Sequence, residues 1–264
     1  MNKKLISKCW CGHTGFTVLF GVSDYEIAQC AACDTVRTLY LKKTPHLQVY
    51  RQQDTNIYLK KEQQFRQTFT KIIKFIQKYK STGNLVDVGA GVGLLVDEAQ
   101  KAGFKAIGFE PSKAMMRAGQ GLGIKLFRHY FSSKLINSAV DIVIVNHVLE
   151  HTKNPAALLK DINQILQPGS LLVIGLPNFA SLMSKIKQER WQSLSPEQHR
   201  WHFTLRTLDQ LVIPYGFIRL GLSTENHDRS RIPWWKLPIY WILDTIALAT
   251  KRGEAILVIY RKIC

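Results

Sequence analysis

Glycines alternate along residues 89–93, directly after an expected strand at 85–88, in a pattern that could bind a nucleotide. Glycine permits a sharp turn and a close backbone approach that a Cβ would block. The dinucleotide fingerprint Gly-x-Gly-x-x-Gly would need its third glycine at position 94, which is Leu94 here. The third glycine of this chain is instead Gly93, so the fingerprint is not met. Glu110 follows the next apolar run and could accept hydrogen bonds from ribose hydroxyls. This pattern predicts a nucleoside cofactor, either NAD or S-adenosylmethionine (SAM); the alternative is a structural turn without a ligand.

Four cysteines lie close together near the N-terminus, as the pairs Cys9-x-Cys11 and Cys30-x-x-Cys33. Four thiolates can close a tetrahedral zinc site, whose binding energy would fold a small unit. The first pair is tighter than a Cys-x-x-Cys pair, so His13 is an alternative ligand. We predict structural zinc here, and buried free thiols are the alternative.

Three histidines are candidates for a general base, because imidazole titrates near neutral pH. His151 follows the apolar run 141–145, whereas His199 and His202 precede an expected helix. Each could equally be a packed or solvent-facing side chain.

A second interpretation concerns His147, Glu150 and His151, which would adjoin on one helical face because they are three and four residues apart. Imidazole and carboxylate together suit a divalent metal. The alternative, which we favour, is that Glu150 and His151 anchor a loop at the substrate opening.

Strand and helix patterns alternate from residue 84 onward, which predicts an α/β fold with a doubly wound parallel sheet. The strands are continuous Val/Ile/Leu runs, as expected where helices cover both faces. Strands are expected at 16–20, 35–41, 85–88, 105–109, 124–127, 141–145, 170–174, 216–222 and 255–260, and helices at 54–80, 94–102, 113–119, 155–166 and 205–213.

The glycine loop and the stretch Asp141–His151 resemble motifs of class I SAM-dependent methyltransferases. That family includes the ubiquinone-biosynthesis O-methyltransferases and enzymes from polysaccharide gene clusters. Further motifs follow in the family's order at 166–170, 176–178 and 202–204, so the resemblance covers roughly residues 84–222. It implies a Rossmann-like, seven-stranded sheet with an antiparallel last strand, and SAM lying across the carboxyl ends of the strands.

The resemblance also implies roles for the candidate site residues. The loop would hold the methionine end of SAM, Glu110 its ribose, and Asn146 and His147 the junction of donor and acceptor. Ubiquinone-pathway relatives carry Glu-x-x-Glu-His where this chain begins with His147, so the first metal ligand proposed for them is replaced. The implied cofactor-binding set is Asp87, Gly89, Ala90, Gly91, Gly93, Glu110, Pro111, Asn146 and His147; the catalytic candidates are His151, His199 and His202.

The cysteine unit resembles N-terminal zinc ribbons of sugar-modifying methyltransferases, although its first pair encloses one residue instead of two. We expect a zinc-ribbon-like module over 1–45, a linking helix over 46–83 and the methyltransferase domain over 84–264. The module would act as a lid or docking unit, because four thiolates leave no open position for catalysis.

The chain carries 36 Lys and Arg against 19 Asp and Glu, a formal net charge of +17. Residues 84–180 hold nine basic and seven acidic side chains, so the positive charge lies mainly outside this block. Positively charged segments on either side of this block would suit an anionic partner. The alternative is that these Lys and Arg side chains lie on helix faces exposed to solvent. With no secretion signal and no apolar run of roughly 20 residues, we expect a cytoplasmic protein.

Residues 231–252 form an aromatic-rich insertion between the last two expected strands, with Trp and Tyr beside Lys and Arg. This mixture is typical of a membrane-surface anchor, so the protein could contact an anionic membrane peripherally. A packed lid or a dimer interface is the alternative, which we favour slightly.

We predict an enzyme that transfers a methyl group from SAM to a hydroxyl of a small-molecule, glycan or lipid-linked acceptor. Residues 146–149 read Asn-His-Val-Leu, not the Asn/Asp-Pro-Pro-aromatic motif of nucleobase amino-group methyltransferases, and the Pro-Cys pair of cytosine-C5 enzymes is absent. Nucleobase methylation is therefore disfavoured. The alternatives are a sugar-nucleotide C-methyltransferase, an RNA or protein methyltransferase, and a non-catalytic nucleic-acid-binding protein.

Overall fold

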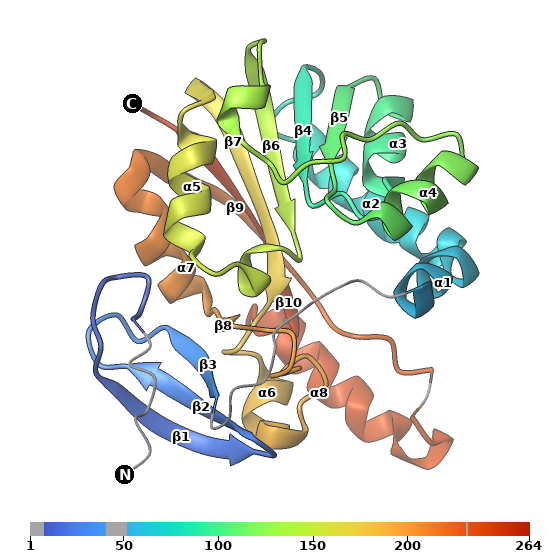
Figure 1. Cartoon of the computed structure of the whole chain (residues 1–264). Helices are drawn as coiled ribbons and strands as arrows, with labels where there is room; N and C mark the ends of the chain where they lie inside the picture. The colour runs from blue at the N-terminus through green and yellow to red at the C-terminus, as the bar shows by residue number, and fades with distance from the viewer. Residues whose placement is uncertain (1–7, 41–51, 231) are drawn as a thin grey trace.

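A computed structural model describes residues 8–40, 52–230 and 232–264 (Figure 1). Its centre is a six-stranded sheet flanked by helices, which confirms the predicted α/β class. The first four strands in the sheet order are parallel, and β10 runs antiparallel to both of its neighbours, as the resemblance implied. The order is β5 (Lys105–Phe109), β4 (Asn84–Val88), β6 (Val140–Asn146), β7 (Leu166–Pro177), β10 (Ala255–Lys262) and β9 (Phe217–Glu225).

The seventh strand predicted at 124–127 is reduced to one bridge, between Phe109 and Phe127. The Phe127 N–H donates to the Gly108 carbonyl at 2.8 Å, and the Glu110 N–H donates to the Phe127 carbonyl at 3.0 Å. The chain then turns at once, because the His129 N–H bonds back to the Phe127 carbonyl at 2.9 Å. Among the described residues the sheet therefore has six strands, with this bridge at the outer edge of β5.

Both faces of the sheet are apolar, and helices cover each of them. Along β6, Ile142 and Ile144 pack on one face, whereas Val143 and Val145 pack on the other, and all four side chains are buried. Helices α2 (Glu62–Gln77) and α3 (Leu94–Lys101) cover the first face, and α5 (Pro155–Asn163) and α7 (Leu205–Val212) cover the second.

The helix expected over 54–80 is two helices, α1 (Gln52–Lys60) and α2, which are separated at Lys61. The backbone of Lys61 leaves helical geometry, with φ −113° and ψ 21°. Helix α1 packs against α4 (Lys113–Gly121), and Tyr58 stacks on Phe65 with ring centroids 4.5 Å apart. This break lets α1 reach the carboxyl end of the sheet.

The N-terminal unit is an antiparallel sheet of β1 (Phe16–Val22), β2 (Tyr25–Cys30) and β3 (Val36–Tyr40). The sequence pattern did not indicate β2, because two of its buried side chains, Ile27 and Ala28, are consecutive rather than alternating. The expected end of this module at Pro45 and the start of the linking segment, 46–51, lie outside the described residues.

A fourth strand, β8 (Trp201–His202), pairs with β3 and joins this unit to the large domain. The Thr38 N–H donates to the Arg200 carbonyl at 3.1 Å, and the Thr38 hydroxyl donates to the His199 carbonyl at 2.7 Å. The Arg37 guanidinium lies 4.7 Å from the centre of the Trp201 ring. The N-terminal unit is therefore part of the wall that holds the histidine-bearing segment.

The insertion between β9 and β10 contains α8 (Leu237–Ala249) and lies at the carboxyl end of β7, since Ala255 pairs with both Pro177 and Glu225. Figure 1 shows α8 near α6 (Leu182–Lys187), at the same end of the molecule. Arg231, the first residue of the expected insertion, lies outside the described residues. The short 3-10 turns are η1 (Ser133–Leu135), η2 (Leu149–His151), η3 (Gln188–Arg190), η4 (Ile213–Tyr215) and η5 (Trp234–Lys236).

Replacement of Thr38 by Val should lower the free energy of unfolding by about 1–3 kcal/mol, because the buried His199 carbonyl and His202 ring both lose their hydroxyl partner. Thr38→Ser keeps the hydroxyl and should recover most of this loss. Urea denaturation of the three proteins measures the effect. A Val variant as stable as the parent would show that this contact does not hold the two units together.

Candidate functional site

A cavity of about 1260 Å³ lies at the carboxyl ends of β4, β5 and β6. This volume exceeds the roughly 300–1,000 Å³ of a typical small-molecule site, so two molecules could occupy it side by side. Gly89 and Glu110 line one part, His147 and His151 another, and Tyr40 of the N-terminal unit a third. The cavity therefore joins the glycine loop to two of the predicted histidines.

The glycine loop needs glycine for different reasons at its three positions. All three have positive φ, at 76° for Gly89, 58° for Gly91 and 86° for Gly93. A Cβ at Gly89 would lie 2.5 Å from Val148, and a Cβ at Gly93 would lie 2.7 Å from Ile124. A Cβ at Gly91 would meet nothing nearer than Tyr58 at 3.9 Å, so glycine is needed there for its backbone angles and not for space.

Glu110 closes the loop from the end of β5. Its two carboxylate oxygens accept hydrogen bonds from the backbone N–H groups of Gly91 at 2.9 Å and Ser112 at 2.7 Å. Burial raises the pKa of Glu110, although these two hydrogen bonds oppose the shift. Each carboxylate oxygen keeps a lone pair for a ribose hydroxyl, so the residue fits the predicted role. Pro111 lies beside it in the cavity wall.

Asp87 is buried in β4 below the loop. Burial, together with the charge of Glu110, raises its pKa to about 7. Two buried carboxylates near each other disfavour a second negative charge and favour a ligand that carries a positive charge. The sulfonium and ammonium groups of SAM meet this requirement.

The remaining predicted cofactor residues differ in position. His147 has a positive φ of 54°, and its N–H donates to the Gly175 carbonyl at 2.8 Å, which directs its ring into the cavity wall. The side chain of Asn146 packs over Gly175, and a Cβ on Gly175 would collide with the Asn146 side-chain oxygen. Asn146 does not line the cavity. Ala90 anchors the loop, because its N–H donates to the Phe109 carbonyl at 3.0 Å.

Glu150 is the buried centre of the histidine cluster. One of its oxygens accepts from His147 Nδ1 at 3.2 Å, and the other has no hydrogen-bond partner among the described residues. Burial raises the pKa of Glu150, but His147 and the nearby His151 and His199 outweigh burial and hold that pKa at about 2. Glu150 is thus a buried carboxylate with one oxygen available.

The three base candidates are not equivalent. His151 is half-buried and lines the cavity, and its ring lies 4.8 Å from that of His199. His199 and His202 are buried and are not cavity-lining residues; burial lowers the pKa of His199 to about 4 and that of His202 to about 3. His202 contacts Thr38 Oγ1 at 2.9 Å inside the interface between β3 and β8.

Glu150, His151 and His199 could also hold a cation, because each offers one ligand atom within 4.8 Å of the others. His151 Nδ1 lies 3.1 Å from the Gln198 carbonyl, and His199 Nδ1 lies 2.9 Å from the Ser193 carbonyl. A carbonyl only accepts, so both Nδ1 atoms donate and each Nε2 is the unprotonated nitrogen, which is the form that a metal binds.

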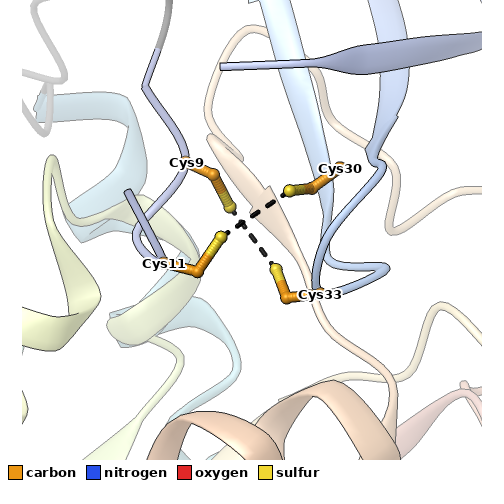
Figure 2. A group of neighbouring side chains, drawn as sticks. All are labelled: Cys9, Cys11, Cys30 and Cys33. Carbon is orange, nitrogen blue, oxygen red and sulfur yellow. Dashed lines mark hydrogen bonds between the residues drawn. The ribbon is translucent and has the colours of Figure 1, made fainter. Parts of the chain in front are cut away.

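The four cysteine side chains converge on one point (Figure 2). The Sγ atoms of Cys9 and Cys33 are 3.6 Å apart, and those of Cys11 and Cys30 are 3.7 Å apart. A tetrahedron with Zn–S bonds of about 2.3 Å has edges of roughly 3.8 Å. All four thiols are free, and the geometry fits four sulfur ligands. His13 is not a member of this group.

Among the described residues, four Lys and Arg side chains line the cavity, a position that the sequence did not predict. Lys113 and Arg117 lie one turn apart on α4, Lys153 follows η2, and Arg200 precedes β8. They come from separate segments, and only the basic composition could have suggested them. They surround an opening that suits an anionic molecule.

The methyltransferase domain family matches residues 60–218, more than half of the sequence, and the chain belongs to this family. A ubiquinone biosynthesis O-methyltransferase from Parvibaculum lavamentivorans is 31% identical over 101 residues. That match covers 35% of this chain and 40% of the relative, less than half of the relative's length. The predicted resemblance is therefore confirmed.

Solved structures show the same fold. A SAM-dependent methyltransferase from Archaeoglobus fulgidus has a TM-score of 0.55 and 18% identity, covering 78% of this chain and 99% of that one. Magnesium protoporphyrin IX methyltransferase from Synechocystis, solved with bound S-adenosylhomocysteine (SAH), has a TM-score of 0.53 and 13% identity, covering 75% and 83%. Family and fold together support SAM as the methyl donor.

The affinity for SAM should increase as the pH rises from 6 to 8. The raised pKa of Asp87 leaves it partly protonated in the free protein at pH 6, and the cationic ligand favours its ionised form. Binding then releases up to one proton, which changes the affinity by at most about tenfold per pH unit. Calorimetry at several pH values measures the dependence.

Asp87→Asn should flatten this pH profile, whereas the control Glu189→Gln, an exposed acid on η3, should preserve it. By the same linkage, Asp87 lowers the stability of the ligand-free protein as the pH rises from its ordinary value of 3.8 towards 7. A wild-type affinity that does not depend on pH would contradict the assignment.

Proposed function

We propose that this chain transfers a methyl group from SAM to a hydroxyl oxygen of an anionic small-molecule, glycan or lipid-linked acceptor. The observation that carries the proposal is one cavity bordered by both the glycine loop and His151. The four cations around it, described above, favour an acceptor with phosphate or carboxylate groups. The volume is large enough for donor and acceptor together.

The loop residues would hold the donor, with Asp87 and the backbone of Gly89–Gly93 at its methionine end and Glu110 at its ribose. SAM supplies a methyl group on a sulfonium, which is already an activated leaving group. His147 would border the transferred methyl, and Asn146 would support that wall through its packing on Gly175. The protein mainly has to align the acceptor oxygen in line with the methyl group.

His151 would act as the general base. It would remove the hydroxyl proton as the oxygen attacks the methyl carbon, and the electron pair of the breaking C–S bond would return to sulfur. The products would be the methyl ether, SAH and a proton on His151. The hydrogen bond of His151 Nδ1 to the Gln198 carbonyl supports this role, because it leaves Nε2 as the acceptor.

A divalent metal on Glu150, His151 and His199 is the competing role for the same cluster, and the free oxygen of Glu150 favours it. Chelation distinguishes the two roles. Transfer that survives EDTA supports His151 as base, whereas transfer that stops and is restored by Mg²⁺, Mn²⁺ or Zn²⁺ supports a metal.

We also propose structural zinc at Cys9, Cys11, Cys30 and Cys33. The sulfur separations support it, as does the burial of three of the four side chains in a small unit. All four positions would be filled, so the metal would stabilise rather than catalyse. Through β3 and β8 it would also stabilise the cavity wall.

Three other functions remain as alternatives. A sugar-nucleotide C-methyltransferase would methylate carbon and need a stronger base. An RNA or protein methyltransferase rests on the basic charge, and a non-catalytic nucleic-acid-binding protein would show steep salt dependence without SAM affinity. Tritium-labelled SAM incubated with organic and aqueous fractions of a cell extract tests these functions, because the labelled fraction identifies the acceptor class.

His151→Gln should slow single-turnover transfer by at least about 100-fold, because the variant lacks the imidazole that would remove the hydroxyl proton. Its affinity for SAM should stay within twofold of the parent by calorimetry, because His151 is assigned to the acceptor oxygen and not to the donor. His129→Gln, an exposed histidine, is the control. A normal rate after replacement of His151, His199 and His202 together would refute histidine catalysis.

Mass spectrometry should find one zinc per chain. Cys30→Ser with Cys33→Ser should abolish the zinc and lower the thermal midpoint, because the metal would fold the unit that supports β8. Cys264→Ser removes the exposed fifth cysteine and should retain full zinc. Zinc that persists in the double variant would place the metal elsewhere.

A further inference from the structure

The outward face of the 232–249 segment is apolar, which is unusual for a helix at a protein surface. Eight large side chains are at least 40% exposed there, including Trp234 at 81% and Trp241 at 71%. Monomeric proteins rarely expose such a contiguous apolar surface without a partner. We define the aromatic face as Trp234, Trp235, Leu237, Ile239, Trp241, Ile242, Ile246 and Leu248.

Helix α8 is apolar on its outward side as well as on most of its inward side. Its inward side consists of Tyr240, Leu243, Asp244 and Ala247, the positions with the lowest exposure. Asp244 is the helix's one charged residue, and it faces the protein rather than the solvent. An ordinary surface helix places charges outward and apolar residues inward, so this helix is built for an apolar environment on its outer side.

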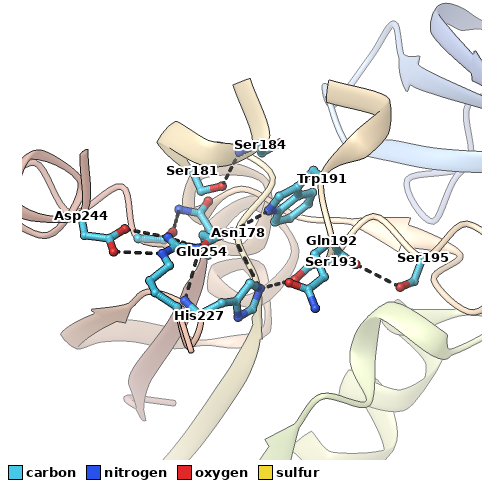
Figure 3. Close-up of polar contacts among 12 residues, drawn as sticks. Asn178, Ser181, Ser184, Trp191, Gln192, Ser193, Ser195, His227, Asp244 and Glu254 are labelled. Atoms are coloured by element: carbon cyan, nitrogen blue, oxygen red, sulfur yellow. Dashed lines mark hydrogen bonds and ion pairs between the residues drawn. The ribbon is translucent and has the colours of Figure 1, made fainter. Parts of the chain in front are cut away.

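A partly buried ion cluster fixes this orientation (Figure 3). Arg229 binds Asp244 at 2.6 and 3.0 Å and Glu254 at 2.6 Å. Glu254, which is 1% exposed, also accepts from the Trp191 indole at 3.3 Å and from the His227 N–H at 3.2 Å. Because these contacts hold Asp244 inward, α8 cannot rotate its aromatic face into the protein.

The cations beside the aromatic face favour a partner that carries negative charge. Lys236 lies 4.6 Å from the ring centre of Trp235, and Lys251 and Arg252 follow the helix. In a symmetric dimer through this face, the cations of one copy would lie against the same cations of the other copy. The two positive groups would repel each other, and the formal net charge of +17 adds to that repulsion. An anionic lipid surface supplies both the negative charge and the apolar layer.

We propose that the aromatic face docks on an anionic membrane surface, with its Trp side chains at the level of the lipid headgroups. The helix would lie in the plane of the interface, because its 13 residues span only about 20 Å. No helix among the described residues is long and apolar enough to cross a membrane. The combination of Trp, aliphatic residues and Lys matches interfacial anchors.

Docking would also orient the cavity. The insertion and the cavity both lie at the carboxyl end of the parallel strands, because the insertion leaves β9 and enters β10 beside Pro177. The ion cluster connects further, through the His227 ring and Ser193, to the ring of His199. The membrane-facing helix and the histidine cluster thus share one rigid support.

Co-sedimentation of the full chain with two kinds of vesicle tests the proposal. The protein should bind vesicles of phosphatidylcholine with phosphatidylglycerol, bind phosphatidylcholine alone weakly, and lose affinity in high salt. Brominated lipid should quench its Trp fluorescence. Trp234→Ser with Trp241→Ser should weaken binding by at least about tenfold and remove the quenching.

The matched control is Ile218→Ser with Ile263→Ser, which removes two exposed apolar side chains at the opposite end of the sheet. This variant should bind like the parent. Lys236→Gln with Lys251→Gln should weaken binding to the anionic vesicles by about fivefold per cation. Unchanged affinity for SAM in each variant shows that the fold is intact.

Three outcomes would overturn the proposal. The first is no binding to either kind of vesicle. The second is equal binding by the parent and the Trp variant, which would indicate general charge attraction. The third is a dimer in analytical ultracentrifugation that the Trp variant loses, with no vesicle binding, which would assign the face to a second copy of the chain.

Discussion

The pairing of β3 with β8 is the contact on which the candidate site depends. It holds the segment 199–202 from one side through Thr38, while the Arg200 N–H donates to the Glu150 carbonyl at 2.8 Å from the other. The segment is thereby fixed between the cysteine unit and η2. In this position His199 meets His151 and Glu150, so the N-terminal unit is a structural part of the candidate site.

Burial alone does not decide the charge of the acids in this site. Asp87 and Glu150 are both nearly inaccessible, yet the pKa of Asp87 rises to about 7 whereas that of Glu150 falls to about 2. The difference lies in their neighbours, because Asp87 faces another carboxylate and Glu150 faces imidazoles. The donor end thus attracts a cation, whereas the histidine end already holds a stable negative charge.

Local requirements were predictable from the sequence, and long-range contacts were not. The positive φ of Gly89 and the helix after Gly93 follow from the spacing of glycines, which acts within a few residues. The partner of His202 is Thr38, 164 residues away, and no local pattern indicates that pairing. The strand expected at 124–127 is only a bridge for a local reason, a turn at His129, that hydrophobic periodicity does not capture.

The two ends of the loop 226–254 are held together by strand pairing, because Ala255 pairs with both Pro177 and Glu225. Because these strand pairs hold both ends of the loop, its outward-facing side chains can change without altering the register of the strands that carry the glycine loop. Related chains that keep Arg229, Asp244 and Glu254 but differ on the outward side of this loop would bind different surfaces around the same cavity.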